Sequence, residues 1–300
     1  MKNFVLIGAG GYIAPRHLKA IRETGNNLLA ALDKHDSVGI LDSYFPHADF
    51  FTEFERFDRH VEKLRRGGQP IDYVTVCSPN YLHDAHARFG LRVGADVICE
   101  KPVVLNPWNV DALMEIEKET RHNVYTLLQL RLHPTMQELK NNILDNAGNK
   151  KHEVDLRYIT ARGNWYRSSW KGDVHKSGGI VTNIGIHFFD LLLWLFGELV
   201  YSQTEYVKEQ SASGILELEK ANIRWFLSTD EHDLSRQAKT ANKKSERILV
   251  LNGQNIPFGD GFEDLHTAAY QQILAGAGIG LVEAKKSIQL TQQIRNAVKG

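Results

Sequence analysis

The sequence predicts an α/β fold with two domains, on three observations. Over residues 1–125, apolar strand segments alternate with helical segments, which is typical of a doubly wound parallel sheet. A glycine-rich turn joins the first of these strands to the first helix. Over residues 126–300, strand segments alternate apolar and polar residues, as strands of a sheet with one open face do. We therefore expect a doubly wound domain over 1–125 and an α+β domain with a mostly antiparallel, open-faced sheet over 126–300.

The composition is that of a globular chain without a dominant charge. Of its 300 residues, 42% are hydrophobic, which is enough for two domains with substantial cores. Lysine and arginine together number 36, as do aspartate and glutamate. Because such a chain has no net field to recruit nucleic acid or an anionic membrane, we expect neither as a partner. An anionic ligand must then be bound by local groups.

Several features favour a cytoplasmic protein. The longest apolar run, 188–196, is interrupted by Asp190 and is far shorter than a membrane span. The amino terminus carries no signal-peptide pattern. Cys77 and Cys99 lie in apolar strand segments, as reduced and buried thiols do. The histidines show no metal-ligand spacing, so we expect no metal site.

The first candidate site is the glycine turn that follows a strand at 3–7. Glycines let the backbone approach a pyrophosphate, whose charge then lies at the amino terminus of the next helix. That helix is expected from Pro15 onward, because proline suits a first helical turn. A strict Gly-x-Gly-x-x-Gly pattern would place glycine at position 13, so this loop carries one extra residue. The turn could also simply reverse the chain. Its candidate cofactor contacts are Gly8, Gly10, Gly11, Tyr12 and Ile13.

An acidic residue follows the second strand, 27–32, at the spacing of a ribose ligand. Asp33 lies 33 − 11 = 22 residues beyond Gly11, close to the roughly 20 residues typical of dinucleotide-binding folds. A carboxylate there accepts hydrogen bonds from the ribose hydroxyls and repels a 2′-phosphate, which favours NAD over NADP. Asp36 and Ser37 could share this role. The alternative is a solvated aspartate at a strand end.

Polar residues also follow the later strands of this half. The segment 97–99 ends abruptly in Glu100, Lys101 and Pro102, and ligands of parallel sheets bind beyond such strand ends. Alone, Glu100 and Lys101 could be ordinary loop residues. The strand 71–77 ends in Ser78, and the strand 125–129 leads to Arg131. Helices are expected at 51–66, 85–91 and 107–121. The candidate cofactor contacts at these strand ends are Ser78, Pro79, Asn80, His83, Glu100, Lys101, Gln129 and Arg131.

The second half combines alternating strands with an arginine-rich aromatic segment at 162–173. Guanidinium groups suit carboxylates or phosphates, and aromatic rings can stack on a base or a sugar. The aromatic residues could instead merely pack. Strands are expected at 153–160, 214–219, 223–228 and 247–251, and helices at 180–195, 265–274 and 282–298. Candidate substrate contacts are Lys101, Arg131, Arg162, Asn164, Trp165, Tyr166, Arg167, Lys171, Asn183 and His187.

Asn183 and His187 are expected on one face of the helix 180–195, because they lie four residues apart. His187 alone could be a buried structural histidine. Its reference pKa of about 6.5 suits a general base, and Lys101 could relay the proton or stabilise an alkoxide. In the oxidation of an alcohol, Asn183 could orient the substrate hydroxyl or the imidazole of His187. Because Lys101 and His187 come from different halves, they are the expected catalytic pair, with Asn183, of a shared cleft.

These motifs resemble a known family, the glucose-fructose oxidoreductase, inositol dehydrogenase and MocA group. The resemblance rests on the Gly8 loop, Ser78-Pro79-Asn80 with His83, Glu100-Lys101-Pro102, and Gly178-Gly179 with His187, and it covers nearly the whole chain. Within the group, the chain is most similar to bacterial UDP-N-acetyl-2-amino-2-deoxyglucuronate dehydrogenases. Asn183 departs from the aspartate of most members.

The resemblance implies a Rossmann domain that binds NAD and a cis peptide bond between Lys101 and Pro102. It implies oxidation of the carbon-3 hydroxyl of a UDP-linked N-acetylamino uronic acid, for surface-polysaccharide (O-antigen) synthesis. It also implies a homotetramer and makes 2-oxoglutarate a candidate co-substrate. Two rivals remain open. One is a dehydrogenase of another sugar or of inositol, and the other is an NAD-binding sensor of sugar nucleotides that lacks catalysis.

Overall fold

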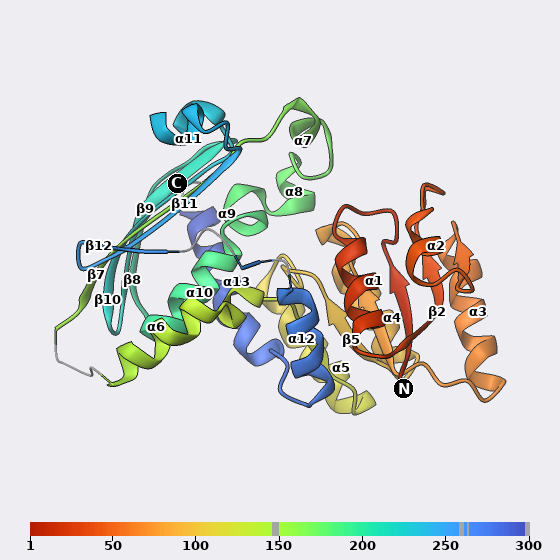
Figure 1. The fold of residues 1–300 in the computed structure, drawn as a ribbon. Coiled ribbons are helices and arrows are strands. Elements are labelled where there is room, and N and C mark those ends of the chain that lie inside the picture. Colours follow the sequence, from red (N-terminus) through yellow and green to blue (C-terminus); the bar gives the residue numbers. More distant parts are fainter. Residues whose placement is uncertain (146–149, 258–260, 263, 298–300) are drawn as a thin grey trace. The chain divides into compact units, whose positions relative to one another are not determined.

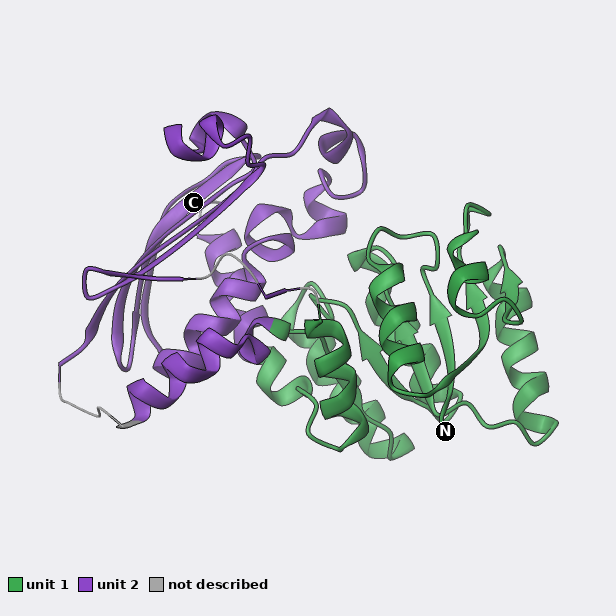
Figure 2. Cartoon of the chain, in the orientation of Figure 1, with its two compact units in different colours: residues 1–129, 263–285 green, residues 130–262, 286–300 purple. Residues whose placement is uncertain are grey.

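The computed structural model describes residues 1–145, 150–257, 261–262 and 264–297. The chain forms two compact units, which Figure 2 colours separately. The first contains residues 1–129 and 263–285, and the second contains 130–262 and 286–300. This division differs from the expected boundary at residue 125, because 263–285 cluster with the first unit.

The first unit is built on a six-stranded sheet in which all strand pairs are parallel. Its strand order is β3-β2-β1-β4-β5-β6, so the chain changes direction across the sheet between β1 and β4. This is the expected doubly wound fold, and its ligand crevice lies at the carboxyl ends of those two strands. The strands are β1 (Asn3–Ile7), β2 (Asn27–Leu32), β3 (Asp49–Phe51), β4 (Tyr73–Val76), β5 (Asp96–Cys99) and β6 (Val124–Thr126).

Helices connect these strands, and a late segment of the chain joins them. In α1 (Ala14–Glu23), the buried Leu18 and Ile21 lie three residues apart, which gives the helix its apolar face. Helix α12 (Leu265–Leu274) packs against α1, although some 240 residues separate them. The remaining helices of this unit are α2 (Ile40–Tyr44), α3 (Phe54–Arg66), η1 (Asn80–Leu82), α4 (His83–Arg92) and α5 (Pro107–Thr120).

The second unit contains another six-stranded sheet, in the order β12-β11-β7-β10-β9-β8. Among the strands that the structure describes in this unit, only β7 and β10 pair in parallel, so the predicted, mostly antiparallel sheet is confirmed. The strands are β7 (His152–Thr160), β8 (Leu199–Val207), β9 (Ser211–Leu218), β10 (Ala221–Ser228), β11 (Ser245–Leu251) and β12 (Gln254–Ile256).

One face of this sheet carries the helices and the core of the unit (Figure 1). Phe189 meets the buried Trp225 of β10 edge to face, with ring centroids 5.2 Å apart. The helices of this unit are η2 (Gln129–Leu132), α6 (Pro134–Asp145), α7 (Asn164–Ser168), α8 (Val174–Ser177), α9 (Gly179–Asn183), α10 (Ile186–Phe196), η3 (Glu231–Asp233) and α11 (Arg236–Thr240). Helix α13 (Leu281–Asn296) begins in the first unit and ends in the second.

The helix expected at 180–195 is interrupted, which corrects that prediction. It forms α9 and α10, and the segment Val174–Asn183 is bent by 43° relative to α10. At the break, a Cβ on Gly185 would lie 2.4 Å from the carbonyl oxygen of Val181, so only glycine fits. No single helix in the described residues is long and apolar enough to cross a membrane, and only this bent pair reaches that composition together.

Candidate active site

The glycine turn after β1 has the geometry of a phosphate-binding loop. Gly8 has a φ of +104°, and a Cβ on it would lie 2.6 Å from the backbone nitrogen of Ser78. A glycine is therefore required where the ends of β1 and β4 approach. The turn closes through a bond from Gly11 N to Gly8 O (3.0 Å) and opens α1, which carries Pro15 in its first turn. The backbone approach that a dinucleotide needs is thus present.

Asp33 lies directly beside this loop, as the sequence predicts. Its Oδ2 accepts a hydrogen bond from Gly10 N at 2.9 Å, and its Oδ1 accepts one from His35 N at 2.9 Å. The carboxylate is only half-buried, so it can still bind a ribose. Asp36 and Ser37 are exposed, and Tyr12 is 90% exposed. The residues in this corner fit the adenosine half of NAD.

The loops after β4 and β5 are joined through His83. Its ring nitrogens lie 2.7 Å from the carbonyl oxygens of Ser78 and of Pro102. Burial lowers the pKa of His83, and the two carbonyl oxygens and the Glu100 charge only partly oppose that shift. The Ser78 hydroxyl contacts Nδ1 of His86 at 2.8 Å, and burial lowers the pKa of His86 to about 4. Asn80 is buried nearby in η1.

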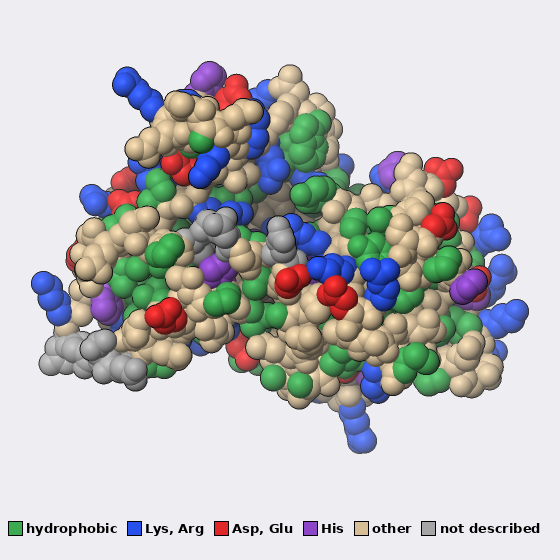
Figure 3. All heavy atoms as spheres, viewed as in Figure 1, with side chains coloured by type: hydrophobic (Ala, Val, Ile, Leu, Met, Phe, Trp, Pro, Cys, Tyr) green, Lys and Arg blue, Asp and Glu red, His purple; other side chains and the backbone are tan. Residues whose placement is uncertain are grey.

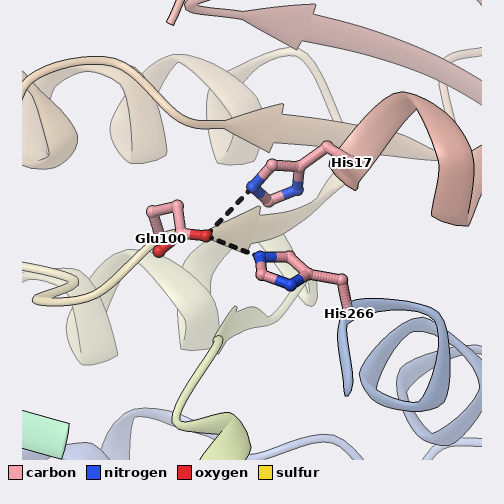
Figure 4. A group of neighbouring side chains, drawn as sticks. All are labelled: His17, Glu100 and His266. Carbon is pink, nitrogen blue, oxygen red and sulfur yellow. Dashed lines mark hydrogen bonds and ion pairs between the residues drawn. The ribbon is translucent and has the colours of Figure 1, made fainter. Parts of the chain in front are cut away.

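Lys101 follows Glu100 at the end of β5, and the predicted cis peptide bond between Lys101 and Pro102 is confirmed. Glu100 is buried, and its Oε1 lies 3.1 Å from Nε2 of His17 and 3.0 Å from Nε2 of His266 (Figure 4). Burial alone would raise the pKa of Glu100, but the hydrogen bonds from the two imidazoles hold it well below its ordinary value. The sequence pattern does not predict either histidine as a partner of Glu100, because His17 lies 83 residues and His266 lies 166 residues away from it along the chain.

In the second unit, Asn183 is buried at the end of α9 and donates a 2.6 Å hydrogen bond to the hydroxyl of Tyr166. Burial raises the pKa of Tyr166. His187 lies half-buried in the first turn of α10. The 2.6 Å bond thus joins two of the predicted substrate contacts, Tyr166 of the arginine-rich aromatic segment and Asn183.

Arg131 forms an ion pair with Asp190, a partner that local sequence patterns do not indicate. Its Nε and one terminal nitrogen donate to the two carboxylate oxygens of Asp190, at 2.8 and 2.6 Å. The side chains are only 14% and 2% exposed. This bidentate ion pair fixes the orientation of the Arg131 guanidinium. It also neutralises most of the guanidinium charge, so Arg131 can offer a ligand oriented N–H donors but little net charge.

Cations and aromatic rings alternate in the segment around α7. The Arg162 guanidinium lies 5.9 Å from the centre of the Tyr166 ring, and Nζ of Lys171 lies 4.6 Å from that of Trp170. Burial and the nearby Arg162 charge lower the pKa of Lys171. Trp165 is 57% exposed, and Arg167 donates a hydrogen bond to Asn164. The segment thus combines positive charge with ring faces. On the face of the molecule drawn in Figure 3, Lys and Arg side chains (blue) lie among Asp and Glu side chains (red).

Two protein-family models match the chain. The model described as the NAD-binding Rossmann fold of an oxidoreductase family, GFO/IDH/MocA, covers residues 2–127. The model described as the C-terminal alpha/beta domain of that family covers residues 150–240. The first matched region contains the whole parallel sheet, and the second contains β7, β8, β9 and β10 of the other sheet.

Solved structures and curated proteins agree with these matches. A dehydrogenase of Thermus thermophilus, WlbA (WbpB), is 46% identical, with a TM-score of 0.95 over 98% of this chain and 95% of that chain. It was solved with NAD and alpha-ketoglutarate, and with NAD and UDP-GlcNAcA. Inositol 2-dehydrogenase of Rhizobium meliloti is 28% identical over 204 residues, 67% of this chain. That match spans 57% of the inositol enzyme, so the chain covers little more than half of this curated relative.

Proposed function

The chain belongs to the GFO/IDH/MocA family of oxidoreductases, and from this premise we propose that it is an NAD-dependent sugar-nucleotide dehydrogenase. Its proposed substrate is UDP-N-acetyl-2-amino-2-deoxyglucuronic acid, whose carbon-3 hydroxyl it oxidises to a ketone. One observation carries this proposal. The 46% identity to the Thermus thermophilus dehydrogenase, solved with NAD and UDP-GlcNAcA, extends over nearly the full length of both chains.

The first unit is an NAD-binding Rossmann domain. When bound, NAD supplies the acceptor for the hydride that leaves carbon 3. The glycine turn would take the pyrophosphate at the amino terminus of α1, with Gly8 and Gly11 keeping the backbone clear. Asp33 would take the adenosine ribose, and its charge would disfavour NADP. Ser78, Pro79, Asn80 and Gln129 remain the candidate contacts for the rest of the cofactor.

Oxidation of the hydroxyl also releases a proton, and the proposal assigns it to His187 or Lys101. His187 would act as the general base. Lys101 would relay the proton, or would stabilise the developing alkoxide if it is charged. Asn183 cannot exchange a proton at neutral pH, so its role is to orient the hydroxyl. Its bond to Tyr166 at 2.6 Å fixes the amide for that task.

The cationic segment around α7 would recognise the substrate's anionic groups. Arg162, Arg167 and Lys171 provide three cations among the rings of Trp165 and Tyr166. Because the chain has no net charge, such a local group is what a carboxylate or diphosphate requires. Asn164 and Arg131 would contribute hydrogen bonds. The carboxylate of the uronic acid is therefore proposed as a specificity determinant.

The keto sugar would be transaminated in O-antigen synthesis, and 2-oxoglutarate would regenerate NAD in place, as the ligand of the Thermus thermophilus structure suggests. Cys77 and Cys99 are free and buried, which fits a reducing cytoplasm. Self-association, proposed as a tetramer, would use the second sheet's hollowed face, where Ile215, Ile248 and Val250 alternate with charged residues.

The experiment that tests this function measures the sugar product directly, by mass spectrometry, over a panel of substrates. The panel contains UDP-N-acetylglucosamine, its uronic acid, free sugars and inositol, each with and without 2-oxoglutarate. We expect turnover of the UDP-uronic acid to exceed that of UDP-N-acetylglucosamine. Equal turnover would refute recognition of the carboxylate. Turnover of free sugars or inositol alone would establish the rival enzyme, and NAD binding without any turnover would establish the sensor.

A further inference from the structure

Glu100 lies at the meeting point of three distant parts of the first unit. His17 reaches it from α1, and His266 reaches it from the start of α12 (Figure 4). Both contact Oε1, at 3.1 and 3.0 Å, while Oε2 accepts a bond from the backbone nitrogen of Lys101 at 3.2 Å. Glu100 is 8% exposed, and the two histidines are 0% and 1% exposed. The carboxylate is thus surrounded by N–H donors and shielded from water.

The hydrogen-bond chain behind His17 identifies the proton on its ring. Burial lowers the pKa of His17 from its ordinary value, against the raising effect of Glu100, and this favours the neutral ring with one proton at neutral pH. Its Nδ1 lies 2.9 Å from the Tyr270 hydroxyl, which in turn lies 2.9 Å from the Thr75 hydroxyl. With the proton on Nε2, His17 donates to Glu100, Tyr270 donates to Nδ1, and Thr75 donates to Tyr270. Every group in this chain then has a partner.

The same three side chains also form the donor set of a metal site, with their nearest ligand atoms within 4.8 Å of one another. A metal would need the Nε2 lone pairs, which would move the ring protons of both histidines to Nδ1. Nδ1 of His266 is buried and has no hydrogen-bond partner among the described residues. A proton there would be unsatisfied, whereas a lone pair is tolerated more easily. The contacts therefore favour a hydrogen-bonded anion over a metal ligand.

We propose that Glu100 is a positioning residue for Lys101. In this proposal His266, which lies in α12 near the end of the chain, holds the Glu100 carboxylate in place. This inference rests on the proposed function, because it assumes that Lys101 acts in the reaction. The carboxylate fixes the Lys101 backbone at the end of β5 and is itself fixed from two sides. Because α1 begins at the glycine turn, the contact between His17 and Glu100 also links that turn to the end of β5.

The test compares His266→Ala with His266→Gln. Alanine removes the donor, whereas the glutamine amide can restore an N–H to Glu100. Lys19→Ala is the matched control, since it breaks an exposed 2.8 Å contact from α1 to Asp264 and leaves Glu100 intact. The readouts are kcat, KM and NAD affinity, together with the acylation rate of Lys101 by a lysine reagent, followed by mass spectrometry without substrate.

We expect His266→Ala to lower kcat by about tenfold to a hundredfold, as misplacement of a reacting group does, with NAD affinity nearly unchanged. His266→Gln should recover most of kcat, and Lys101 acylation should change severalfold in the alanine variant only. Equal losses in both variants, or an unchanged acylation rate, would overturn the positioning role. So would a stoichiometric metal in the purified protein that His266→Ala loses. If the wild type turns over no UDP-sugar, the proposed function fails. The acylation rates then still decide whether Glu100 and His266 position Lys101.

Discussion

Gly10 donates its backbone N–H to the carboxylate of Asp33 at 2.9 Å, which joins the nucleotide loop to the end of β2. The other carboxylate oxygen is held by His35 N. Asp33 is therefore oriented before any ribose arrives, which reduces the ordering cost of binding. It also shapes the loop, so its substitution has two separable consequences.

Asp33→Ala should weaken NAD binding by about tenfold to a hundredfold, because a hydrogen bond to a charged group contributes about 1.5–3 kcal/mol. Affinity for NADP should improve relative to NAD, since the repulsion of the 2′-phosphate disappears. Asp33→Asn is the control that keeps an acceptor for Gly10 while removing the charge. Fluorescence titration with both cofactors measures the ratio. An unchanged NAD-to-NADP ratio would move the ribose contact to Asp36 or Ser37.

Gly8→Ala should destabilise the first unit and abolish NAD binding. The added Cβ would lie 2.6 Å from Ser78 N at a φ of +104°, so strain and overlap act together. Each costs about 1–3 kcal/mol. Gly25→Ala is the matched control, because its φ is +72° but its Cβ would meet nothing within 4 Å. Urea denaturation of both variants should give a clearly larger loss at Gly8; equal losses would show that backbone strain alone matters.

Stability should fall as the pH drops from about 6.5 toward 4, because buried histidines resist protonation. The pKa of His86 is lowered to about 4, so between these values the unfolded chain binds the extra proton. The free energy of unfolding then decreases by up to about 1.4 kcal/mol per pH unit for this group, and His17 acts in the same direction. Urea denaturation at several pH values in this range gives the free energy of unfolding at each pH. The slope of that free energy against pH should be shallower for His86→Gln than for the wild type. Identical slopes would contradict the assignment.

Lys101→Ala and His187→Ala should each lower kcat by about a hundredfold or more, which is typical for loss of positioned proton transfer. NAD affinity should change little, because neither side chain is assigned to the adenosine half. Lys118→Ala, on the exposed side of α5, is a control for removing a lysine from the first unit. Steady-state kinetics by product detection decides. Near-normal turnover in either variant would remove that residue from the mechanism.

Local patterns predicted the doubly wound sheet, the Gly8 loop and Asp33, because each depends on residues close in sequence. The partners of Glu100 were not predictable in this way. His17 and His266 meet it only through tertiary packing, and a histidine on an apolar helix face carries no signal of its partner. Asp190 likewise interrupts an apolar run in the sequence, and nothing in that run indicates that it is the buried partner of Arg131.

Two errors in secondary structure have a similar cause. The break at Gly185 lies inside a mostly apolar segment, and the contacts that exclude a side chain there, from the Val181 carbonyl oxygen and Leu227, exist only in the folded chain. No strand is predicted at β8, because all of its residues are at least partly exposed and its apolar alternation is weak. Both features depend on the surrounding sheet, which periodicity along the chain does not report.

The central claim is that hydride leaves carbon 3 of a UDP-sugar, and isotope transfer tests it most directly. The UDP-uronic acid is prepared with deuterium at carbon 3, and separately at carbon 4, and is incubated with the enzyme, NAD and 2-oxoglutarate. Mass spectrometry of the products should find the carbon-3 deuterium in the reduced nicotinamide or in 2-hydroxyglutarate, and none from carbon 4. Deuterium that stays on carbon 3 of the product, or that is transferred from carbon 4, would contradict the account.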